Sequence, residues 1–431
     1  MQNRGPFIIL ISVIVALAAL VIGQFLFIQN TNTPTRGIEE LITIAAQEPD
    51  SEQWGINFPN QYSTWKQTGE NAIKTTYGGS VPFDKLEADP RLLKLFAGYP
   101  FSKGYTEDRG HANSLIDVRD SKRINEKTPG TCYSCKASDN PALWQALGME
   151  TYDKTPFAEL GQQIHNPIGC ANCHEAETMR LIVTNPALDE ALKAQGKDWT
   201  TFTRQEMRTV VCANCHVEYY FKGEGKYLTF PWANGTRIED ITKYYQEANF
   251  TDWTHPNSQA PLIKMQHPEY ELFTAGSTHF NAGVACADCH MPYTRDGAAK
   301  FSNHNVQSPL VNAEAACGTC HTDVSYVVGR VTIIQKQVFD TLIATEDALV
   351  AAIDAIEAAL ADANVNAAKL AEAQQLHREA QLRWDFIAAE NSMGFHNPSE
   401  ALRILANATD LARQAQIKAM EAMSGAATAN R

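Results

Sequence analysis

Cysteine is the residue type with the clearest chemical pattern in this chain. All ten cysteines fall into five C-x-x-C pairs, which leaves none for a disulfide between distant segments or for a free nucleophile. In four pairs a histidine follows directly: Cys170, Cys173 and His174; Cys212, Cys215 and His216; Cys286, Cys289 and His290; Cys317, Cys320 and His321. In C-x-x-C-H the two thiols can form thioethers to one porphyrin, and the imidazole can bind its iron. The pattern therefore predicts four covalently attached haems.

Structural zinc is the competing interpretation. Two C-x-x-C pairs can together build a tetrahedral site from four thiolates. Such a site gives no reason for a histidine after each second cysteine. We therefore favour haem.

The fifth pair, Cys132 and Cys135, is followed by Lys136 instead of histidine. A neutral amine can bind iron through its lone pair, but a free lysine is protonated at neutral pH. Burial and the iron itself must therefore keep the amine deprotonated. An axial ligand of this unusual type predicts a haem that does something other than relay electrons. The alternative is a degenerate motif that holds no haem.

Histidines supply the candidates for the second axial ligands. The chain has 12, and four of them belong to the motifs above. Four relay haems need four more, and the residue types alone leave eight candidates: His111, His165, His255, His267, His279, His304, His377 and His396. We expect His165, His255 and His377 to be structural or surface residues, with His377 at a solvated position of an Ala-rich helix.

The elements that position these motifs differ between the two parts of the chain. Residues 37–323 are rich in Pro, Gly, Asn and aromatic residues, which predicts short helices joined by loops, with very little strand. The rest has helical spacing of apolar residues and predicts long helices at 325–360, 367–390 and 398–423. Pro398 after Asn397 is typical of a helix start. The sequence thus predicts a mainly α fold, and we expect its C-terminal helices to be scaffold or a dimer interface.

The amino end predicts export. Residues 7–28 are almost wholly apolar, and a helix of about 20 residues spans a membrane. Arg4 precedes the segment, so we expect the body of the chain on the extracytoplasmic, or periplasmic, side. We expect an uncleaved anchor more than a cleaved signal. The expected parts are an anchor or signal with its linker at 1–36, a haem-bearing catalytic region at 37–323 and a long-helix region at 324–431.

Composition excludes two classes of protein. Hydrophobic residues make up 44% of the chain, which is enough for a sizeable core and excludes a disordered protein. The net charge is −13 and no basic block occurs, so a nucleic-acid partner is not expected.

A lysine-bearing motif followed by four C-x-x-C-H motifs resembles ammonia-forming cytochrome c nitrite reductase, a pentahaem enzyme. The resemblance runs over about 109–396 and includes Arg109-Gly-His111, Glu218-Tyr219, the KMQHPE segment that begins at Lys264, and GFHNP around His396. It implies that Lys136 is the fifth ligand of a catalytic haem whose sixth position is open.

The same resemblance implies roles for other residues. His267, Tyr219 and an arginine would surround the open position; Arg123 is the best match for that arginine, and Arg119 is its rival. Calcium would bind the Glu218 carboxylate, the Tyr219 and Lys264 carbonyls and the Gln266 side chain. The distal ligands would be His304 for the second haem, His111 for the third, His396 for the fourth and His279 for the fifth.

The activity that the resemblance implies is the six-electron reduction of nitrite to ammonium, by a homodimer supplied by a membrane quinol-oxidising cytochrome or another donor. Haems can deliver the electrons, positive groups can stabilise charge as N–O bonds break, and a histidine and a tyrosine can transfer protons. The alternative is a membrane-anchored multihaem electron conduit or quinol dehydrogenase. The predicted anchor favours that alternative, whereas the lysine motif disfavours it, because a conduit needs no open coordination site.

The haem count is directly testable. We expect the mature protein to exceed the mass of its polypeptide by five haems, and acid–acetone should not extract them because thioether bonds hold them. Intact-mass spectrometry before and after acid–acetone treatment measures the added mass and whether the haems stay attached. A mass corresponding to four haems would show that the Lys136 motif is degenerate.

Overall fold

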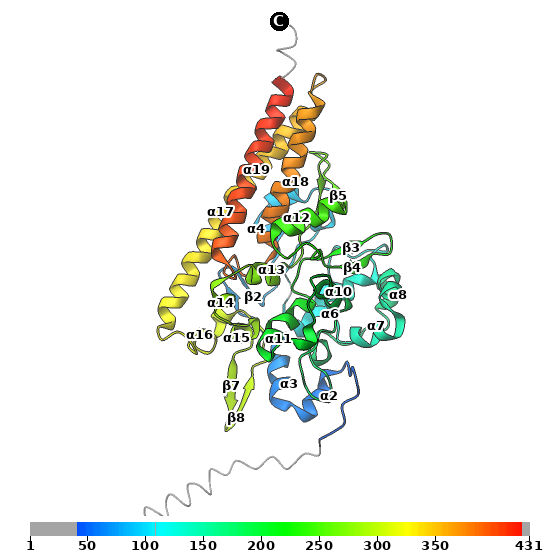
Figure 1. The fold of residues 1–431 in the computed structure, drawn as a ribbon, viewed down its shortest axis with the longest axis vertical. Helices are drawn as coiled ribbons and strands as arrows, with labels where there is room; N and C mark the ends of the chain where they lie inside the picture. Colours follow the sequence, from blue (N-terminus) through cyan, green and yellow to red (C-terminus); the bar gives the residue numbers. More distant parts are fainter. Residues whose placement is uncertain (1–40, 108, 425–431) are drawn as a thin grey trace, which may run out of the picture. The chain divides into compact units, whose positions relative to one another are not determined.

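The computed structural model describes residues 41–107 and 109–424 (Figure 1). Residues from Ile44 onward form one compact unit. Within the described ranges no helix is both long and apolar enough to cross a membrane. The predicted membrane segment at 7–28 lies outside these ranges, as does the linker up to residue 36.

Short helices and loops make up the part that precedes the long helices (Figure 1). Its α-helices are α2 (Ser51–Asn57), α3 (Pro59–Lys66), α4 (Lys85–Ala88), α5 (Arg91–Leu95), α6 (Ser114–Arg119), α7 (Asn140–Leu147), α8 (Met149–Lys154), α9 (Phe157–Leu160), α10 (Pro186–Ala194), α11 (Arg204–Val210), α12 (Ile238–Glu247), α13 (Glu269–Thr274), α14 (Thr278–Asn281), α15 (Cys286–His290) and α16 (Ala313–Cys317). The mainly α class predicted from the sequence is confirmed.

Strands are few and short, as expected. Those of the described residues form antiparallel pairs of two: β1 (Lys74–Thr75) with β2 (Gly78–Gly79), β3 (Tyr220–Lys222) with β4 (Tyr227–Thr229), β5 (Trp253–Thr254) with β6 (Pro261–Leu262), and β7 (Tyr293–Asp296) with β8 (Ala299–Ser302). An isolated two-stranded pair is marginally stable in water, so these hairpins depend on the helices and loops around them.

Each C-x-x-C motif begins on a helical turn. The first three lie at 3₁₀ turns, Gly130–Tyr133, Cys170–Asn172 and Val211–Asn214, whereas the last two lie on α15 and at the end of α16. Residues three apart share one side of such a turn, so the two thiols of a pair face the same way. The backbone N–H of His174, His216 and His321 bonds the carbonyl of the first cysteine in its motif, at 3.0, 2.9 and 2.9 Å.

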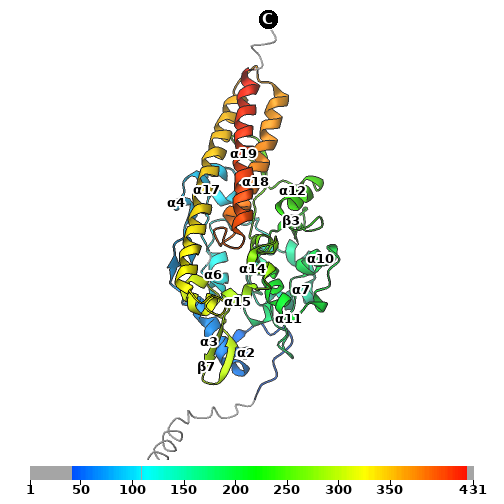
Figure 2. The ribbon, with the colours of Figure 1, turned by 60° about the vertical axis from the view of Figure 1, so that its left-hand side comes forward.

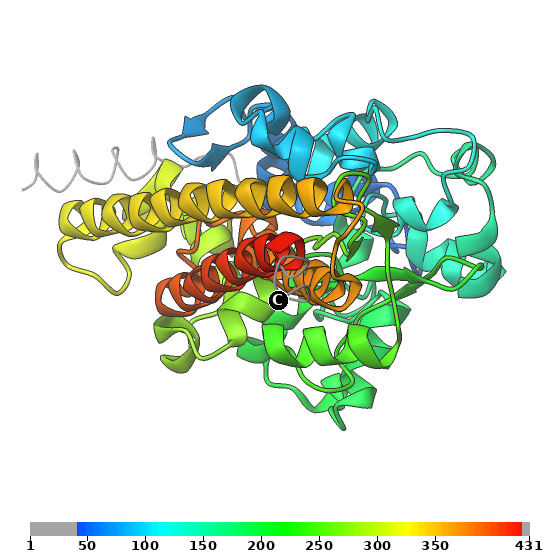
Figure 3. The ribbon, with the colours of Figure 1, turned by 90° about the horizontal axis from the view of Figure 1, so that it is seen from above.

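Three long helices form the C-terminal part: α17 (Val324–Leu360), α18 (Ala367–Ala389) and α19 (Pro398–Ser424). They run side by side in both further views (Figures 2 and 3). The predicted bounds are confirmed to within one residue. Side-chain oxygens cap two of the starts, since Asp323 accepts from the Tyr326 N–H and Asn366 from the N–H groups of Ala368 and Lys369.

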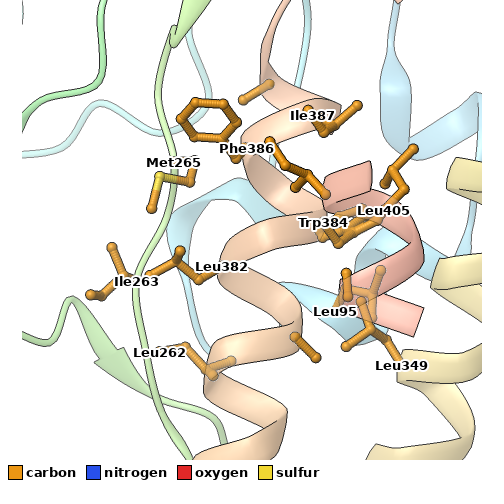
Figure 4. Packing of buried hydrophobic residues seen from close by; sticks show 14 of the residues in the cluster. Leu95, Leu262, Ile263, Met265, Leu349, Leu382, Trp384, Phe386, Ile387 and Leu405 are labelled. Atoms are coloured by element: carbon orange, nitrogen blue, oxygen red, sulfur yellow. The ribbon is translucent and has the colours of Figure 1, made fainter. Parts of the chain in front are cut away.

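The main hydrophobic core joins this three-helix part to the haem-motif part. Leu382, Trp384 and Phe386 of α18 are buried against α19 and α17 on one side and against the extended segment with Ile263 and Met265 on the other (Figure 4). The second half of α18 buries side chains all round its circumference, as an internal element does, whereas Ala371, Glu372 and Gln375 of its first half are exposed. Helix α18 therefore anchors a segment that the sequence assigns to the active site.

His377 corrects one expectation, because it is fully buried and not solvated. Its Nδ1 lies 3.1 Å from Ser258 Oγ and its Nε2 lies 2.9 Å from Gln381 Oε1. The Ala-rich composition of α18 did not show that this helix has neighbours on all sides. Burial, together with the nearby His255, lowers the pKa of His377 to about 3.

This burial predicts an acid-dependent loss of stability. The folded-state pKa of about 3 lies below the unfolded value of about 6.5, so the unfolded chain binds the extra proton between these values. The contribution of neutral His377 is complete above pH 6.5 and is lost as the pH falls toward 3, at about 1.4 kcal/mol per pH unit. Denaturant unfolding of H377Q should therefore show a shallower loss of free energy between pH 6.5 and 4.5 than the wild type. H165Q, at an exposed histidine, should follow the wild type; equal slopes for H377Q and wild type would contradict the prediction.

Candidate haem-lined active site

One large cavity, of about 1960 Å³, collects the predicted cofactor residues. All ten cysteines, Lys136 and the four motif histidines line it. His111, His267, His279, His304 and His396 line it as well. Of the eight histidines that composition left open, only His165, His255 and His377 are absent from its wall. The turns described above therefore face a common space.

Three of the histidine pairs that the resemblance implied have the spacing that haem iron requires. Two imidazoles on opposite sides of one metal ion have ring centres about 6.2 Å apart, given a metal–nitrogen bond of about 2.0 Å and about 1.1 Å from nitrogen to ring centre. The observed separations are 6.2 Å for His174 with His304, 6.2 Å for His290 with His396, and 6.4 Å for His279 with His321. The second, fourth and fifth motifs are thus paired with the distal histidines that the resemblance implied.

The outer nitrogens of these imidazoles are held by the protein. The Nδ1 atoms of His174, His290 and His304 lie 2.9, 3.0 and 2.8 Å from the carbonyl oxygens of Met179, Gln307 and Ser302. A carbonyl can only accept, so each Nδ1 carries the proton and Nε2 keeps the lone pair that binds a metal. Burial lowers the pKa of His290 and His304 to about 4, which favours the neutral, ligating form.

The third motif has a different environment. The His216 ring lies 6.4 Å from that of His267. His111 lines the same cavity, and its pKa is lowered to about 4 by burial and then by the charges of His216 and Lys136. The ring spacing pairs His216 with His267 and not with His111. His111 as the distal ligand of the third haem therefore stays a prediction.

The lysine motif lies beside one of the two candidate arginines. Arg123 lines the cavity, where its guanidinium lies 4.3 Å from the Phe101 ring centre and donates to the Gly104 carbonyl at 2.9 Å. Its charge acts on Cys132 of the motif and on Tyr219. Arg119 is not part of the cavity wall, because its guanidinium donates to the Ile164 carbonyl at 2.8 Å and to Tyr133 Oη at 3.3 Å. The geometry thus favours Arg123.

Glu269 is a buried carboxylate for which the sequence analysis gave no role. Its Oε1 lies 3.7 Å from His267 Nδ1 and accepts a hydrogen bond from Asn391 at 2.7 Å, and its Oε2 lies 3.8 Å from His216 Nδ1. Burial raises the pKa of Glu269, but the two histidines more than offset it and hold the pKa well below the usual range. Its position within the KMQHPE segment, two residues after His267, was the available signal.

Three of the four residues predicted to bind calcium, Glu218, Lys264 and Gln266, lie in one hydrogen-bond network. Glu218 is fully buried; its Oε1 accepts from Tyr245 Oη at 2.7 Å and its Oε2 from the Gln266 N–H at 2.6 Å. The Gln266 side chain contacts the Lys264 carbonyl at 3.2 Å. Burial raises the pKa of Glu218 well above its ordinary value, and a cation here would offset that cost.

The donor types in this network suit a hard cation. Ca²⁺ prefers carboxylate, amide and carbonyl oxygens, and the set has one carboxylate with neutral oxygens around it. Residues 41–107 and 109–424 contain no group of three or more His, Cys, Asp or Glu side chains placed to hold a metal ion. Calcium at Glu218 therefore depends on neutral oxygens and stays a prediction at this point.

Comparison with known proteins identifies the family. The family model described as cytochrome c552 matches residues 50–431. The chain belongs to the cytochrome c552 family. This match covers all five C-x-x-C motifs and the three long helices, so the haem interpretation of the cysteine pattern is confirmed and the zinc alternative is set aside.

Members of the cytochrome c552 family that resemble this chain span most of its length. A cytochrome c-552 of Parabacteroides distasonis is 43% identical over 382 residues, which cover 87% of this chain and 77% of the relative. A cytochrome c nitrite reductase subunit NrfA of Nitratidesulfovibrio vulgaris is 38% identical over 422 residues, covering 88% and 80%. The solved cytochrome c nitrite reductase of Desulfovibrio desulfuricans, described as having two calcium sites, superimposes with a TM-score of 0.83 at 37% identity, covering 90% and 88%. The resemblance to cytochrome c nitrite reductases is thus confirmed.

The axial pairing can be tested by spin state. H304A should leave the second haem attached, since Cys170 and Cys173 are unchanged, but should remove the ligand opposite His174. We therefore expect a new high-spin signal in the electron paramagnetic resonance spectrum at unchanged haem content. H255A, at a histidine outside the cavity, serves as the control and should give no such signal. An unchanged spectrum for H304A would assign the distal ligand elsewhere.

Proposed function

We propose that this chain reduces nitrite to ammonium with six electrons, at the haem attached to Cys132 and Cys135 with Lys136 as its fifth ligand. The observation that carries the proposal is the gathering of Arg123, Tyr219 and His267 on the wall of the cavity that holds the lysine motif. The NrfA subunit of Nitratidesulfovibrio vulgaris and the solved Desulfovibrio desulfuricans enzyme support it. A pure electron conduit would have no use for an anion-binding arginine at an open iron.

Arg123 supplies positive charge for the anion. The haems, when bound, provide the electrons and an iron atom that takes the nitrogen of nitrite. Arg123 is held by the Gly104 carbonyl and by Phe101, so its guanidinium is oriented before nitrite arrives. A preorganised cation attracts the anion and stabilises negative charge on oxygen as each N–O bond breaks.

Tyr219 and His267 serve proton transfer. Burial raises the pKa of Tyr219 well above its ordinary value, so the phenol keeps its proton and can donate it to a departing oxygen. His267 holds and transfers a proton at its imidazole. Glu269, ionised between His216 and His267, stabilises the positive charge of such a proton.

Calcium belongs to the same proposal. Glu218 and the Gln266 side chain, with the Tyr219 and Lys264 carbonyls, would bind Ca²⁺ next to the catalytic residues. The ion would fix Tyr219 and the segment that leads to His267, and it would add positive field to an acidic protein. The calcium sites of the solved relative support this assignment.

Location, donor and assembly complete the proposal. The chain would act on the extracytoplasmic or periplasmic side, held by the segment at 7–28, and would receive electrons from a membrane quinol-oxidising cytochrome or another donor. It would form a homodimer through α17, whose Tyr326 and Ile333 are 65% and 49% exposed. Exposed large apolar side chains on a long helix are typical of an association surface.

Ammonium formation from nitrite with reduced viologen tests the activity. We expect the wild type to form ammonium, and K136H to keep five haems while its turnover falls at least about tenfold, because the ligand field and geometry at the iron both change. The haem content of both proteins, measured as in the mass experiment, is the control. Unchanged turnover in K136H would remove the special role of Lys136, and a wild type that forms no ammonium would favour the conduit.

A further inference from the structure

Asp385, near the C-terminal end of α18, holds two consecutive residues of the active-site segment. Its Oδ1 accepts a hydrogen bond from the Lys264 ammonium at 2.8 Å, and its Oδ2 accepts one from the Met265 backbone N–H at 2.8 Å. The side chains of Asp385 and Lys264 are both 1% exposed. One carboxylate on a long helix therefore fixes this segment from a place that water does not reach.

The residues that follow carry the chemistry. The Gln266 backbone N–H donates to Glu218 Oε2 at 2.6 Å, and the Lys264 carbonyl is 3.2 Å from the Gln266 side chain. His267 comes next and lines the cavity. A shift of this segment against α18 would thus displace the calcium-binding oxygens and His267 together.

The ammonium of Lys264 also contacts Phe101, the aromatic residue that supports Arg123. Its Nζ lies 4.8 Å from the ring centre of Phe101 and 5.2 Å from that of Phe96. The Arg123 guanidinium lies 4.3 Å from the same Phe101 ring. Attraction of both cations to the π electrons of one ring connects the position of Lys264 to that of Arg123.

A buried ion pair is an inefficient way to stabilise a fold, because the cost of desolvating both charges cancels most of their attraction. Such a pair instead fixes the relative position of the two side chains, since both charges are satisfied when the ammonium and the carboxylate face each other. We propose that Asp385 is a positioning residue that acts through Lys264 to set the place of Arg123 and of the calcium-binding segment. The inference rests on the proposed nitrite reduction, and it assigns to α18 a part in the active site beyond that of scaffold.

D385N tests the proposal through the KM for nitrite and the Ca²⁺ affinity, which would not change if Asp385 only stabilised the fold. The amide keeps an acceptor for the Met265 N–H but removes the carboxylate charge that faces the Lys264 ammonium. We expect the KM for nitrite to rise about tenfold with a smaller change in kcat, because a displaced guanidinium loses charge-assisted hydrogen bonding to the anion. The affinity for Ca²⁺, titrated with the metal alone against a chelator, should fall about as much. Haem content should not change.

E346Q is the matched control. Glu346 is a carboxyl of α17 buried in the same three-helix part, 1% exposed, whose Oε1 accepts from Trp384 Nε1 at 3.3 Å, next to Asp385. Among residues 41–107 and 109–424, Glu346 forms no hydrogen bond or ion pair with Met265 or Lys264. E346Q should leave the KM for nitrite and the Ca²⁺ affinity within twofold of the wild type.

The double variant K264M/D385N separates the effect on the position of the active-site segment from the effect on the thermal stability of the protein. Removing both charges should recover much of the thermal stability that D385N loses, since the buried ammonium that lacked its carboxylate is gone as well, while the carbonyl of residue 264 remains. Under the proposal the KM for nitrite stays raised in this stable protein. A KM and a Ca²⁺ affinity that return to wild-type values with the stability, or that never change in D385N, would overturn it.

Failure of the proposed nitrite reduction would give a different result from failure of the positioning role of Asp385. A wild type that forms no ammonium from nitrite would reject nitrite reduction for all variants alike. The order of Ca²⁺ affinities among wild type, D385N, K264M/D385N and E346Q would still decide whether Asp385 positions the segment.

Discussion

Thioether attachment requires the two cysteines of a pair to face the same side of the chain, and this steric requirement governs the architecture around the cavity. Short helical turns satisfy it, since residues three apart share a side, and the imidazole of the next residue is then directed to the same space. Five such turns surround one cavity of about 1960 Å³. Apolar side chains cannot fill a space reserved for cofactors, so the hydrophobic clusters lie around the cavity and against the long helices.

The long helices provide the rigidity that such a hollow structure lacks. Helix α18 is enclosed by α17, α19 and the segment with Ile263 and Met265, and it buries polar side chains among its apolar ones (Figure 4). Three of those polar groups pair with other parts of the chain: Gln381 donates to the Leu95 carbonyl, Arg378 to the Phe250 carbonyl, and Asp385 accepts from Lys264. Buried polar groups are costly unless paired, and these pairings fix how the haem-binding part is placed against the helix.

Burial and neighbouring charges also set the protonation of the groups in the site. Imidazoles that must bind iron are kept neutral by desolvation, as for His290 and His304. Carboxylates that must remain charged have cationic neighbours, as Glu269 has His216 and His267. Glu218 has no such neighbour of comparable strength, and its raised pKa is the reason that a bound cation suits that position. Under the proposed function, the anion would meet Arg123 and protonated donors at the lysine motif.

The sequence by itself predicted covalent haem attachment, the mainly α class and the bounds of the long helices, and it singled out Lys136 as the exceptional residue among the five motifs. These properties depend on spacing over a few residues, because thioether geometry, helix periodicity and capping are local. Only the tertiary structure gave the ring spacing of His174 and His304, placed Arg123 but not Arg119 on the cavity wall, buried His377 and brought Asp385 to Lys264. Each of these contacts joins distant parts of the chain, and which distant residues meet is decided by the packing of whole helices and loops around the cavity, which no local pattern encodes.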